Sequence, residues 1–289
     1  MSIKDITIII ATFKSNEKII KCLDSINSRA QVLVIENSND SQFKENLEKK
    51  YNNVECILAG ANIGYGWANN IGLKKVQSKY ALILNPDATL HTDTLENFLK
   101  VTKEISKFAI MGPYIQDKKL LNDNEYLKNK NPIETDNVKG FAMFLNMSEF
   151  DEIGFFDEKF FFYFEEIDLC KRLTKKRKKI YLIPDIKVDH GDGASHDRVI
   201  NFEMELSRNW HWMWSTFTYH KKHKGFLISL LIVLPKLCSA TIKVFIYTLI
   251  FNSKKKIYYQ RMSGLINAII GKKSWYRPKV WNFSFCIDL

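Results

Sequence analysis

The stretch "YALILNPDATL" (Tyr80–Leu90) decides the fold. It begins as a short apolar run of the kind that fills a buried strand, and the run stops at Asn85-Pro86-Asp87. Proline ends a strand because it has no backbone N–H to donate. An acid there adds nothing to a core, whereas a carboxylate that faces a divalent cation has a clear use. Asp87 is therefore either an ordinary loop acid or part of a ligand site.

Short β-branched runs alternate with polar segments of helical length through the first half of the chain. The polar segments predict helices near Asn16–Ser25, Ser41–Lys50 and Gly66–Val76. The apolar runs predict strands at Ile6–Ala11, Gln31–Glu36, Val54–Ala59 and Tyr80–Asn85. This alternation is typical of βαβ units, so we predict an α/β fold with a mostly parallel sheet flanked by helices. Ligands bind such sheets at the carboxyl ends of the strands, where Glu36 and Asp87 both lie.

The composition limits the partners and the compartment. A chain of 289 residues fits one large α/β domain or a domain with an appendage. Its net charge of +11 favours anionic partners such as nucleic acid, anionic lipid or a phosphorylated substrate. The five cysteines are far apart and form no CxxC pair, which argues against a disulfide framework or a zinc site and suits a reducing cytoplasm. The start "MSIKDITIII" runs directly into a strand, so we expect no secretory signal.

The last third has the composition of a helical appendage. We therefore divide the chain into a catalytic domain over residues 1–200 and a basic, aromatic helical region over residues 201–289. The run Phe226–Phe251 is long enough to span a bilayer, but it carries Pro235, Lys236 and Lys243. It could lie in the membrane interface with Trp and Tyr at headgroup depth, pack inside the protein, or span the membrane. We favour the interface, because Lys and Arg can then face anionic lipid.

Polar residues also cluster in a glycine-containing loop at Ala61–Leu73. Gly64 and Gly66 allow the backbone to approach a ligand closely, and Asn62, Asn69 and Asn70 offer amide donors. The loop matches neither the GxGxxG fingerprint nor a Walker loop, so it could equally be the start of an ordinary helix.

A second cluster follows the aromatic run Phe160–Phe164. Glu165 and Glu166 begin a predicted helix, where the helix dipole favours acids, and Asp168 could simply pair with Arg172 four residues later. An apolar lip beside a carboxylate raises its pKa, however, and can make it a general base.

The sequence "IKVDHGDGASH" places His190 in a loop after a short strand, flanked by acids. His190 could be structural or a metal ligand, and Ser195 and His196 could contact phosphate. A Ser-His-Asp hydrolase is excluded by the missing GxSxG motif. The basic run Lys171–Lys179 is better explained as a solvated helix end facing lipid headgroups or a lipid diphosphate, so we expect no nucleic-acid partner.

Six motifs in order resemble those of family 2 glycosyltransferases, in their rhamnosyltransferase-like branch. The matching stretches, which cover about residues 6–195, are "ITIIIATFKSNEKIIKCLDSI", "VLVIENSND", "NIGYGWANNIGLK", "LILNPDATL", "GFFDEKFFFYFEEIDLCKRL" and "VDHGDGAS". The resemblance implies a GT-A fold, which is Rossmann-like, a nucleotide-sugar donor, a divalent cation (Mn²⁺ or Mg²⁺), and inverting transfer to an acceptor hydroxyl. The helices that such enzymes often carry for membrane association are matched only loosely by the last third.

The same resemblance implies roles for individual residues. Asp87 and His190 would bind the metal ion. Glu166 would be the catalytic base, with Asp168 behind it and Glu165 as the alternative base. The residues near the nucleotide would be Thr12, Phe13, Glu36, Asn62, Gly64, Asn70 and Asn85. Three of these positions depart from the usual pattern: Asn85 stands at the first Asp of a DxD motif, and Glu36 and Glu166 each replace an Asp.

The expected function is a sugar transferase at the cytoplasmic face of a bacterial-type membrane, bound peripherally to the anionic lipid surface. It would extend a surface polysaccharide, such as an O-antigen, on a lipid-linked acceptor, with dTDP-rhamnose as the expected donor. A UDP-hexose or UDP-N-acetylhexosamine donor is one alternative, and a non-catalytic nucleotide or nucleic-acid binding module is another. The Asn- and Lys-rich segment Lys118–Asn137 and the aromatic helix near Trp210–Trp214 are expected to shape the acceptor side.

Overall fold

The computed structural model describes residues 1–114, 131–191 and 196–279. The chain divides into two compact units. The first contains Met1–Glu158 and Glu165–Asp197, and the second contains Lys159–Phe164 and the chain from Arg198 onward. The short segment Lys159–Phe164 therefore belongs to the second unit although the residues on both sides of it belong to the first.

The first unit is built on a sheet with strand order β3-β2-β1-β4-β8-β6-β9-β7. Its strands are β1 (Ile6–Thr12), β2 (Gln31–Glu36), β3 (Val54–Leu58), β4 (Tyr80–Leu84), β6 (Ile110–Pro113), β7 (Ile133–Glu134), β8 (Ala142–Asn146) and β9 (Ile180–Ile183). The neighbours among β3, β2, β1 and β4 are parallel, whereas β8 runs antiparallel to both β4 and β6. The predicted α/β fold with a mostly parallel sheet flanked by helices is confirmed.

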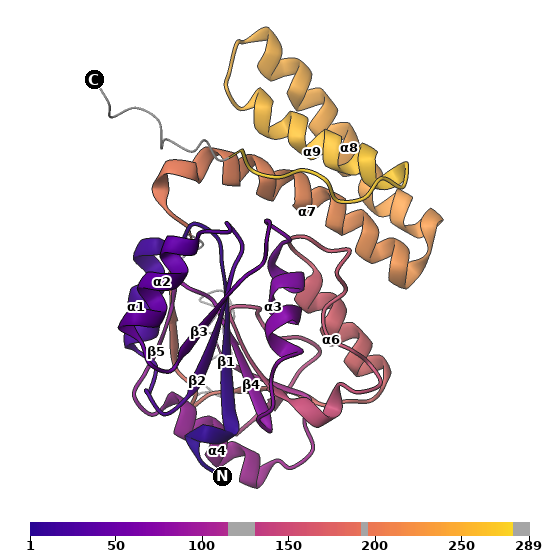
Figure 1. Cartoon of the computed structure of the whole chain (residues 1–289). Helices are drawn as coiled ribbons and strands as arrows, with labels where there is room; N and C mark the ends of the chain where they lie inside the picture. The colour runs from indigo at the N-terminus through magenta and orange to yellow at the C-terminus, as the bar shows by residue number, and fades with distance from the viewer. Residues whose placement is uncertain (115–130, 192–195, 280–289) are drawn as a thin grey trace, which may run out of the picture. The chain divides into compact units, whose positions relative to one another are not determined.

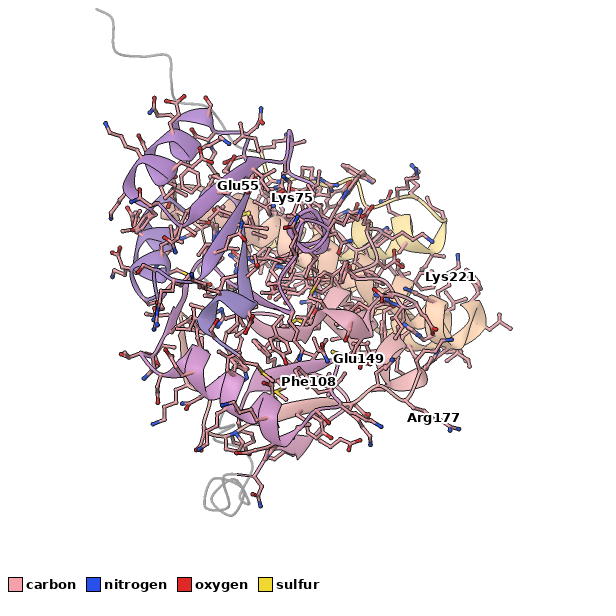
Figure 2. The ribbon with its side chains drawn as sticks, turned by 60° about the horizontal axis from the view of Figure 1, so that its bottom comes forward. Glu55, Lys75, Phe108, Glu149, Arg177 and Lys221 are labelled. Carbon is pink, nitrogen blue, oxygen red and sulfur yellow. The ribbon has the colours of Figure 1, made fainter. Side chains whose placement is uncertain are left out.

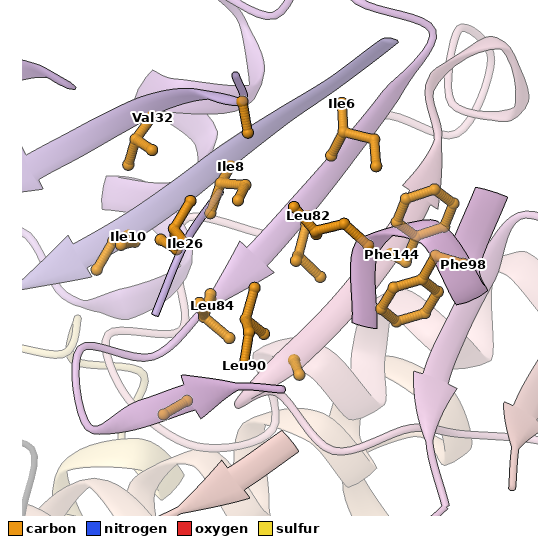
Figure 3. Close-up of a cluster of buried hydrophobic side chains, with 14 of the residues drawn as sticks. Ile6, Ile8, Ile10, Ile26, Val32, Leu82, Leu84, Leu90, Phe98 and Phe144 are labelled. Atoms are coloured by element: carbon orange, nitrogen blue, oxygen red, sulfur yellow. The ribbon is translucent and has the colours of Figure 1, made fainter. Parts of the chain in front are cut away.

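Helices cover both faces of this sheet (Figure 1). They are α1 (Asn16–Asp24), α2 (Ser41–Lys50), α3 (Tyr65–Leu73), α4 (Thr94–Glu104) and α6 (Glu165–Lys175). Because side chains alternate along a strand, β1 sends Ile6, Ile8 and Ile10 into the core under α1, α2 and α4, as Figure 3 shows for that cluster. Ile9 and Ala11 point to the other face, where α3 and α6 pack.

Surface ion pairs add little to this core. Glu55 of β3 and Lys75, just beyond α3, lie next to one another in Figure 2, with 3.4 Å between their charged atoms. Both side chains are about half exposed, and pairs of this kind contribute at most ~1 kcal/mol. Burial of the two apolar faces of the sheet therefore fixes the positions of the strand ends.

A small second sheet places one loop against another. Strand β5 (Ala88–Leu90) follows Asp87 directly and pairs antiparallel with β10 (Val188–His190), with His190 opposite Ala88. This pairing brings His190 to the end of β4 from a point far along the chain.

The second unit is helical. Its helices are α7 (Asn201–Lys224), α8 (Phe226–Leu249) and α9 (Lys255–Ile269). Trp210 and Trp214 are buried in its core together with Phe160 of the segment Lys159–Phe164. The expectation that the aromatics of this region lie at headgroup depth is therefore wrong for these two tryptophans, because they supply the apolar core that three helices need. The α7 and α9 backbones approach closely at Gly264, where a Cβ atom would overlap the carbonyl oxygen of Trp210.

Helix α8 differs from its neighbours in its exposure. It is long and apolar enough to cross a membrane, and only 17% of its most hydropathic window is buried in the protein. Leu231 and Phe245 are 70% and 65% exposed. The alternative that this segment packs inside the protein is therefore wrong.

Candidate active site

The carboxyl ends of β1 and β2 bring two of the expected nucleotide-binding residues together. Thr12 and Glu36 are register partners at this edge, and both are buried. Glu36 already has hydrogen-bond partners, since its carboxylate accepts from the backbone N–H groups of Ser38 (2.8 Å) and Asp40 (2.7 Å) and from the Ser38 hydroxyl. Glu36 thus shapes the loop that follows β2, and its contact with a nucleotide stays a prediction. Phe13, the next residue after Thr12, is half-buried.

Asp87 and His190 meet beyond the end of β4. The His190 Nε2 atom lies 3.4 Å from Asp87 Oδ1 and 3.4 Å from the Asn85 side-chain nitrogen. Phe141 stacks on the imidazole with 4.6 Å between the ring centroids. The Asp87 side chain is only 2% exposed, yet neither of its carboxylate oxygens finds a hydrogen-bond partner within the part of the chain that the structure describes. His190 is close enough for an ion pair but does not satisfy these oxygens.

This arrangement fits a divalent cation with few protein ligands. A buried carboxylate with two unused oxygens is the kind of group that Mg²⁺ or Mn²⁺ recruits, and such ions take further ligands from water and substrate phosphates. Within residues 1–114, 131–191 and 196–279, no group of three His, Cys, Asp or Glu side chains is positioned to hold a metal. Asp87 and His190 would therefore hold the ion only together with oxygen atoms of a bound ligand.

The glycine-containing loop after β3 has a largely structural arrangement. The Asn62 Oδ1 atom accepts from the Gly64 N–H at 3.3 Å, and Gly64 has a positive φ of 91° at the start of α3. Asn70 clamps a distant turn, because its amide donates to the Phe156 carbonyl (2.9 Å) and accepts from the Phe156 N–H (3.0 Å). The Asn70 side chain is thus occupied within the protein, while nucleotide contacts at Asn62 and Gly64 stay predictions.

Glu165 and Glu166 begin α6, and both are enclosed. Each has one buried carboxylate oxygen, Oε2, without a hydrogen-bond partner among the described residues. Burial, and then the negative charge of Glu166, raises the pKa of the Glu165 carboxyl well above its ordinary value. Burial also raises the pKa of Glu166, against the opposing effects of hydrogen bonds from the backbone N–H groups of Glu166 and Ile167 and, more weakly, of the charge of Lys139. A carboxylate with a raised pKa is a stronger base, as the sequence analysis expected of this cluster.

Tyr65 lies near both groups of acids, and no motif in the sequence singles it out. Its hydroxyl donates to the Gly140 carbonyl, and its pKa is raised by burial and by the charges of Glu165, Glu166 and, more weakly, Asp87.

The neighbouring residue Phe141 completes the link to the end of β4, since its carbonyl accepts from the Asn85 N–H at 2.9 Å. The segment Gly140–Phe141 thus lies next to both groups of acids, since Phe141 stacks on His190 and a Cβ atom at Gly140 would lie 3.7 Å from Glu166 Cγ. No local motif marks this segment, since β8 runs antiparallel to β4 and reaches the site only through sheet pairing.

Asp168 is close to these acids in sequence but differs from them in having an ion-pair partner among the described residues. Its side chain is fully buried and accepts from Arg172 Nε at 2.8 Å, the pairing considered in the sequence analysis. Arg172 also donates to the Ile153 carbonyl at 2.8 Å and to the Phe155 carbonyl. The pair therefore anchors the turn before the aromatic run, and a catalytic role for Asp168 stays a prediction.

The aromatic run itself ends in an unusual backbone conformation. Tyr163 and Phe164, immediately before α6, both have positive φ, at 67° and 70°. A residue other than glycine in this region costs on the order of 1–3 kcal/mol, and such strain gathers at functional sites. The conformation sets the direction in which Glu165 and Glu166 leave the run. Of the other expected phosphate contacts, His196 is buried and Ser195 lies outside the described residues.

We expect Glu165→Gln to stabilise the protein at neutral pH. Because the folded state raises the pKa of Glu165 above the unfolded value of about 4.5, the folded state binds the proton more tightly. The free energy of unfolding of the wild type should therefore fall as the pH rises above that value, and the glutamine variant should lose less. At pH 7 we expect a gain of about 1–3 kcal/mol, because the variant buries no charge, although its amide still lacks hydrogen-bond partners.

Urea unfolding between pH 5 and pH 8 measures this difference. Glu55→Gln, on the exposed edge strand β3, is the matched control and should follow the wild type. A constant gap between Glu165→Gln and the wild type across this range would show that Glu165 is not responsible.

Solved structures with similar architecture identify the fold. A mannosyltransferase from Pyrobaculum calidifontis, solved in complex with GDP-mannose and Mn²⁺, aligns with a TM-score of 0.56 and 13% identity over 92% of this chain and 86% of its own. Residues 1–349 of the S. aureus protein TarS align with a TM-score of 0.51 and 13% identity, over 94% and 93% of the two chains. The fold is therefore the GT-A fold that the sequence resemblance implied.

The sequence model of Glycosyl transferase family 2 matches residues 7–170. The chain belongs to this family. It is 26% identical over 198 residues to the low-salt glycan biosynthesis hexosyltransferase Agl10 of Haloferax volcanii, covering 61% of this chain and 64% of that one. It is 26% identical over 247 residues to the rhamnosyltransferase WbbL of Escherichia coli K12, covering 73% and 91%. An N-acetylglucosaminyl-diphospho-decaprenol L-rhamnosyltransferase of Mycobacterium tuberculosis is 22% identical over 58% of this chain and 68% of its own.

Proposed function

We propose that this protein is an inverting glycosyltransferase that moves a hexose, with rhamnose as the first candidate, from a dTDP- or UDP-linked donor to a hydroxyl of a glycan acceptor. One observation carries the proposal: two sets of carboxylates with buried, unused oxygens, Asp87 and the pair Glu165–Glu166, both lie next to the segment Gly140–Phe141. Similarity to two rhamnosyltransferases supports the choice of sugar.

The two sets of acids suit the two charges that change in this reaction. A divalent cation at Asp87 and His190 would offset the negative charge of the leaving nucleoside diphosphate. Glu166 would accept the proton of the acceptor hydroxyl. The hydroxyl oxygen would attack the anomeric carbon from the face opposite the leaving diphosphate. Tyr65, buried beside Glu165 and Glu166, would keep water away and hold the segment that positions both groups.

We place the reaction at the cytoplasmic face of a bacterial-type membrane, with the protein bound peripherally and a lipid-linked surface glycan of the O-antigen kind as acceptor. The exposed apolar surface of α8 supports this location, because soluble proteins rarely leave such a surface uncovered. The name of the mycobacterial relative, which acts on a lipid-linked diphosphate, supports the class of acceptor.

A second donor class has support of its own. The relative from Haloferax volcanii is named only as a hexosyltransferase, which favours a UDP-hexose or UDP-N-acetylhexosamine donor as the alternative to dTDP-rhamnose. A panel of these donors with product detection separates the two.

Thermal-shift measurements test the nucleotide and the metal together. UDP or dTDP at about 100 times its Kd should stabilise the folded protein by about 2.7 kcal/mol, and only with Mn²⁺ or Mg²⁺ present. Asp87→Asn should abolish the metal-dependent part of the shift. Asp189→Asn changes a neighbouring exposed acid on β10 and serves as the matched control. Equal shifts for both variants, or a shift without metal, would overturn the assignment of Asp87.

A further inference from the structure

The helical unit carries positive charge with almost no acid to balance it. Between Glu205 and Asp288 the sequence contains no Asp or Glu, while lysines and arginines occur throughout this stretch. Positive charge of this density attracts an anionic surface within about one Debye length. The charge alone gives no site, so the arrangement of the individual cations is what matters.

Three of these cations converge on one groove. Helices α8 and α9 run side by side (Figure 1), and between them lies a cavity of about 250 Å³. It is lined by Pro235, Lys236, Ser239 and Lys243 of α8 and by Tyr258 and Arg261 of α9. Lys236 and Lys243 are seven residues apart, which places them on the same side of α8 two turns from each other.

The groove has the polar groups that a phosphate requires. The Lys243 Nζ atom lies 4.9 Å from the centre of the Tyr258 ring, and the Arg261 guanidinium carbon lies 5.8 Å from the same ring. Within the described chain, none of Lys236, Lys243 and Arg261 forms an ion pair with a carboxylate. Like charges that share a small cavity repel one another, and a bound anion reverses that penalty.

The surroundings of the groove indicate where the anion comes from. Six exposed apolar side chains of α8 are three, four or eight residues apart, which places them on one side of the helix as a stripe: Leu227, Leu231, Leu234, Ile242, Phe245 and Leu249. A helix with an apolar stripe and lysines elsewhere on its circumference suits the boundary between headgroups and acyl chains. A second copy of the chain fits less well, because it would bring a second set of unpaired lysines to the same surface.

We propose that the groove between α8 and α9 binds the phosphate of an anionic membrane lipid while the apolar stripe of α8 enters the acyl boundary. The inference rests on the membrane location given under the proposed function, but not on the sugar or on the reaction. Both lysines of the groove must reach headgroup depth, so α8 lies along the membrane surface and does not cross it.

Flotation of the purified full chain with lipid vesicles tests the site. Vesicles of phosphatidylcholine with 30% phosphatidylglycerol should retain the wild type, and vesicles of phosphatidylcholine alone should retain far less. The double variant Lys236→Gln/Lys243→Gln should bind the anionic vesicles about 30-fold more weakly, as expected for two lysines near such a surface. The control Lys272→Gln/Lys273→Gln removes the same charge from exposed positions outside the groove and should change binding by less than about threefold.

Each other result overturns the proposal in a different way. Equal losses in the two double variants would show diffuse charge attraction and no groove site. Equal binding to both kinds of vesicle would show that the net negative charge of the lipid headgroup is not recognised. Resistance of the membrane-bound protein to alkaline carbonate would show that α8 spans, and a dimer in solution that ignores vesicles would make α8 an interface between copies. Metal-dependent nucleotide binding, measured on the same variants, should be unchanged, so a failure of the groove and a failure of the transferase assignment are distinguishable.

Discussion

Replacing Glu166 by glutamine should reduce the rate of sugar transfer by about 10²–10⁴-fold, the usual contribution of a positioned general base. Because glutamine has the same shape as glutamate, the packing at the start of α6 is kept. The amide cannot act as a base, so only proton transfer is lost. Burial raises the pKa of Glu166, which makes its carboxylate a stronger base than an exposed glutamate. Nucleotide binding should survive, because the expected metal and nucleotide residues lie on other elements. Transfer of sugar from a labelled donor, together with titration of the free nucleotide, measures both quantities.

Glu165→Gln is the matched control, because Glu165 is adjacent, is more deeply buried than Glu166 and also has a raised pKa. If Glu166 is the base, Glu165→Gln should retain most of the activity. Loss of activity only in Glu165→Gln would transfer the role to Glu165. Normal turnover in both variants would remove this pair from the chemistry altogether.

The pH profile offers a second check on the same residue. A base must be deprotonated to act, so transfer by the wild type should fall on the acid side of the raised pKa of Glu166. Because that pKa is raised, the fall should begin at a higher pH than for an exposed glutamate. The residual activity of Glu166→Gln should lack this acid limb.

The sheet could be predicted from the sequence because its signals are local. The runs at Gln31–Glu36 and Tyr80–Leu84 are apolar on both faces, and each is followed by a polar turn that ends it. Periodicity and turn residues alone therefore define βαβ units and the edge where Glu36 and Asp87 lie. The resemblance to family 2 added the order of the motifs, which the comparison with known proteins supports.

The parts of the site that sequence reasoning missed depend on contacts between distant segments. In the sequence Tyr65 is one residue of a glycine-containing loop. Its importance comes from the hydrogen bond that its hydroxyl donates to the Gly140 carbonyl, seventy-five residues later. The nucleotide contact of Asn70 stays a prediction, and the sequence did not indicate that its amide bonds to the backbone of Phe156, eighty-six residues away. A sequence gives the type of a polar side chain but not which of several possible partners it has, and several buried amides and acids compete here.

The helical unit shows the same limit in its apolar residues. Trp210 and Phe245 are both aromatic residues of helical segments, but Trp210 is buried in the core and Phe245 is 65% exposed. Helices α7 and α9 approach closely at Gly264 and bury the sides that face each other, whereas α8, the most apolar of the three helices, keeps most of its surface exposed. The composition of Phe226–Phe251 already favours a helix at the membrane interface, and the packed structure shows which of its side chains remain uncovered.

Replacing Arg172 by leucine should lower the free energy of unfolding by about 3–5 kcal/mol, a large part of the stability of an ordinary domain. The substitution leaves the fully buried Asp168 carboxylate without the guanidinium that pairs with it at 2.8 Å. It also removes the donors to the carbonyls of Ile153 and Phe155. Urea unfolding of the full chain measures the loss. Arg172→Lys keeps the charge but not the planar guanidinium, so its free energy of unfolding should lie between those of the wild type and Arg172→Leu.

The double variant Asp168→Leu/Arg172→Leu separates the charge from the packing. Replacing a buried ion pair by apolar residues is often nearly neutral, whereas removing one partner is strongly destabilising, so the double variant should be more stable than Arg172→Leu alone. That result would show that the Asp168 carboxylate destabilises the protein only when Arg172 is absent. Asp168 would then be a positioning residue for the turn before the aromatic run. If Arg172→Leu unfolds at the wild-type urea concentration while Asp168→Asn abolishes transfer in a folded protein, Asp168 belongs with Glu166 in the chemistry and the clamp is incidental.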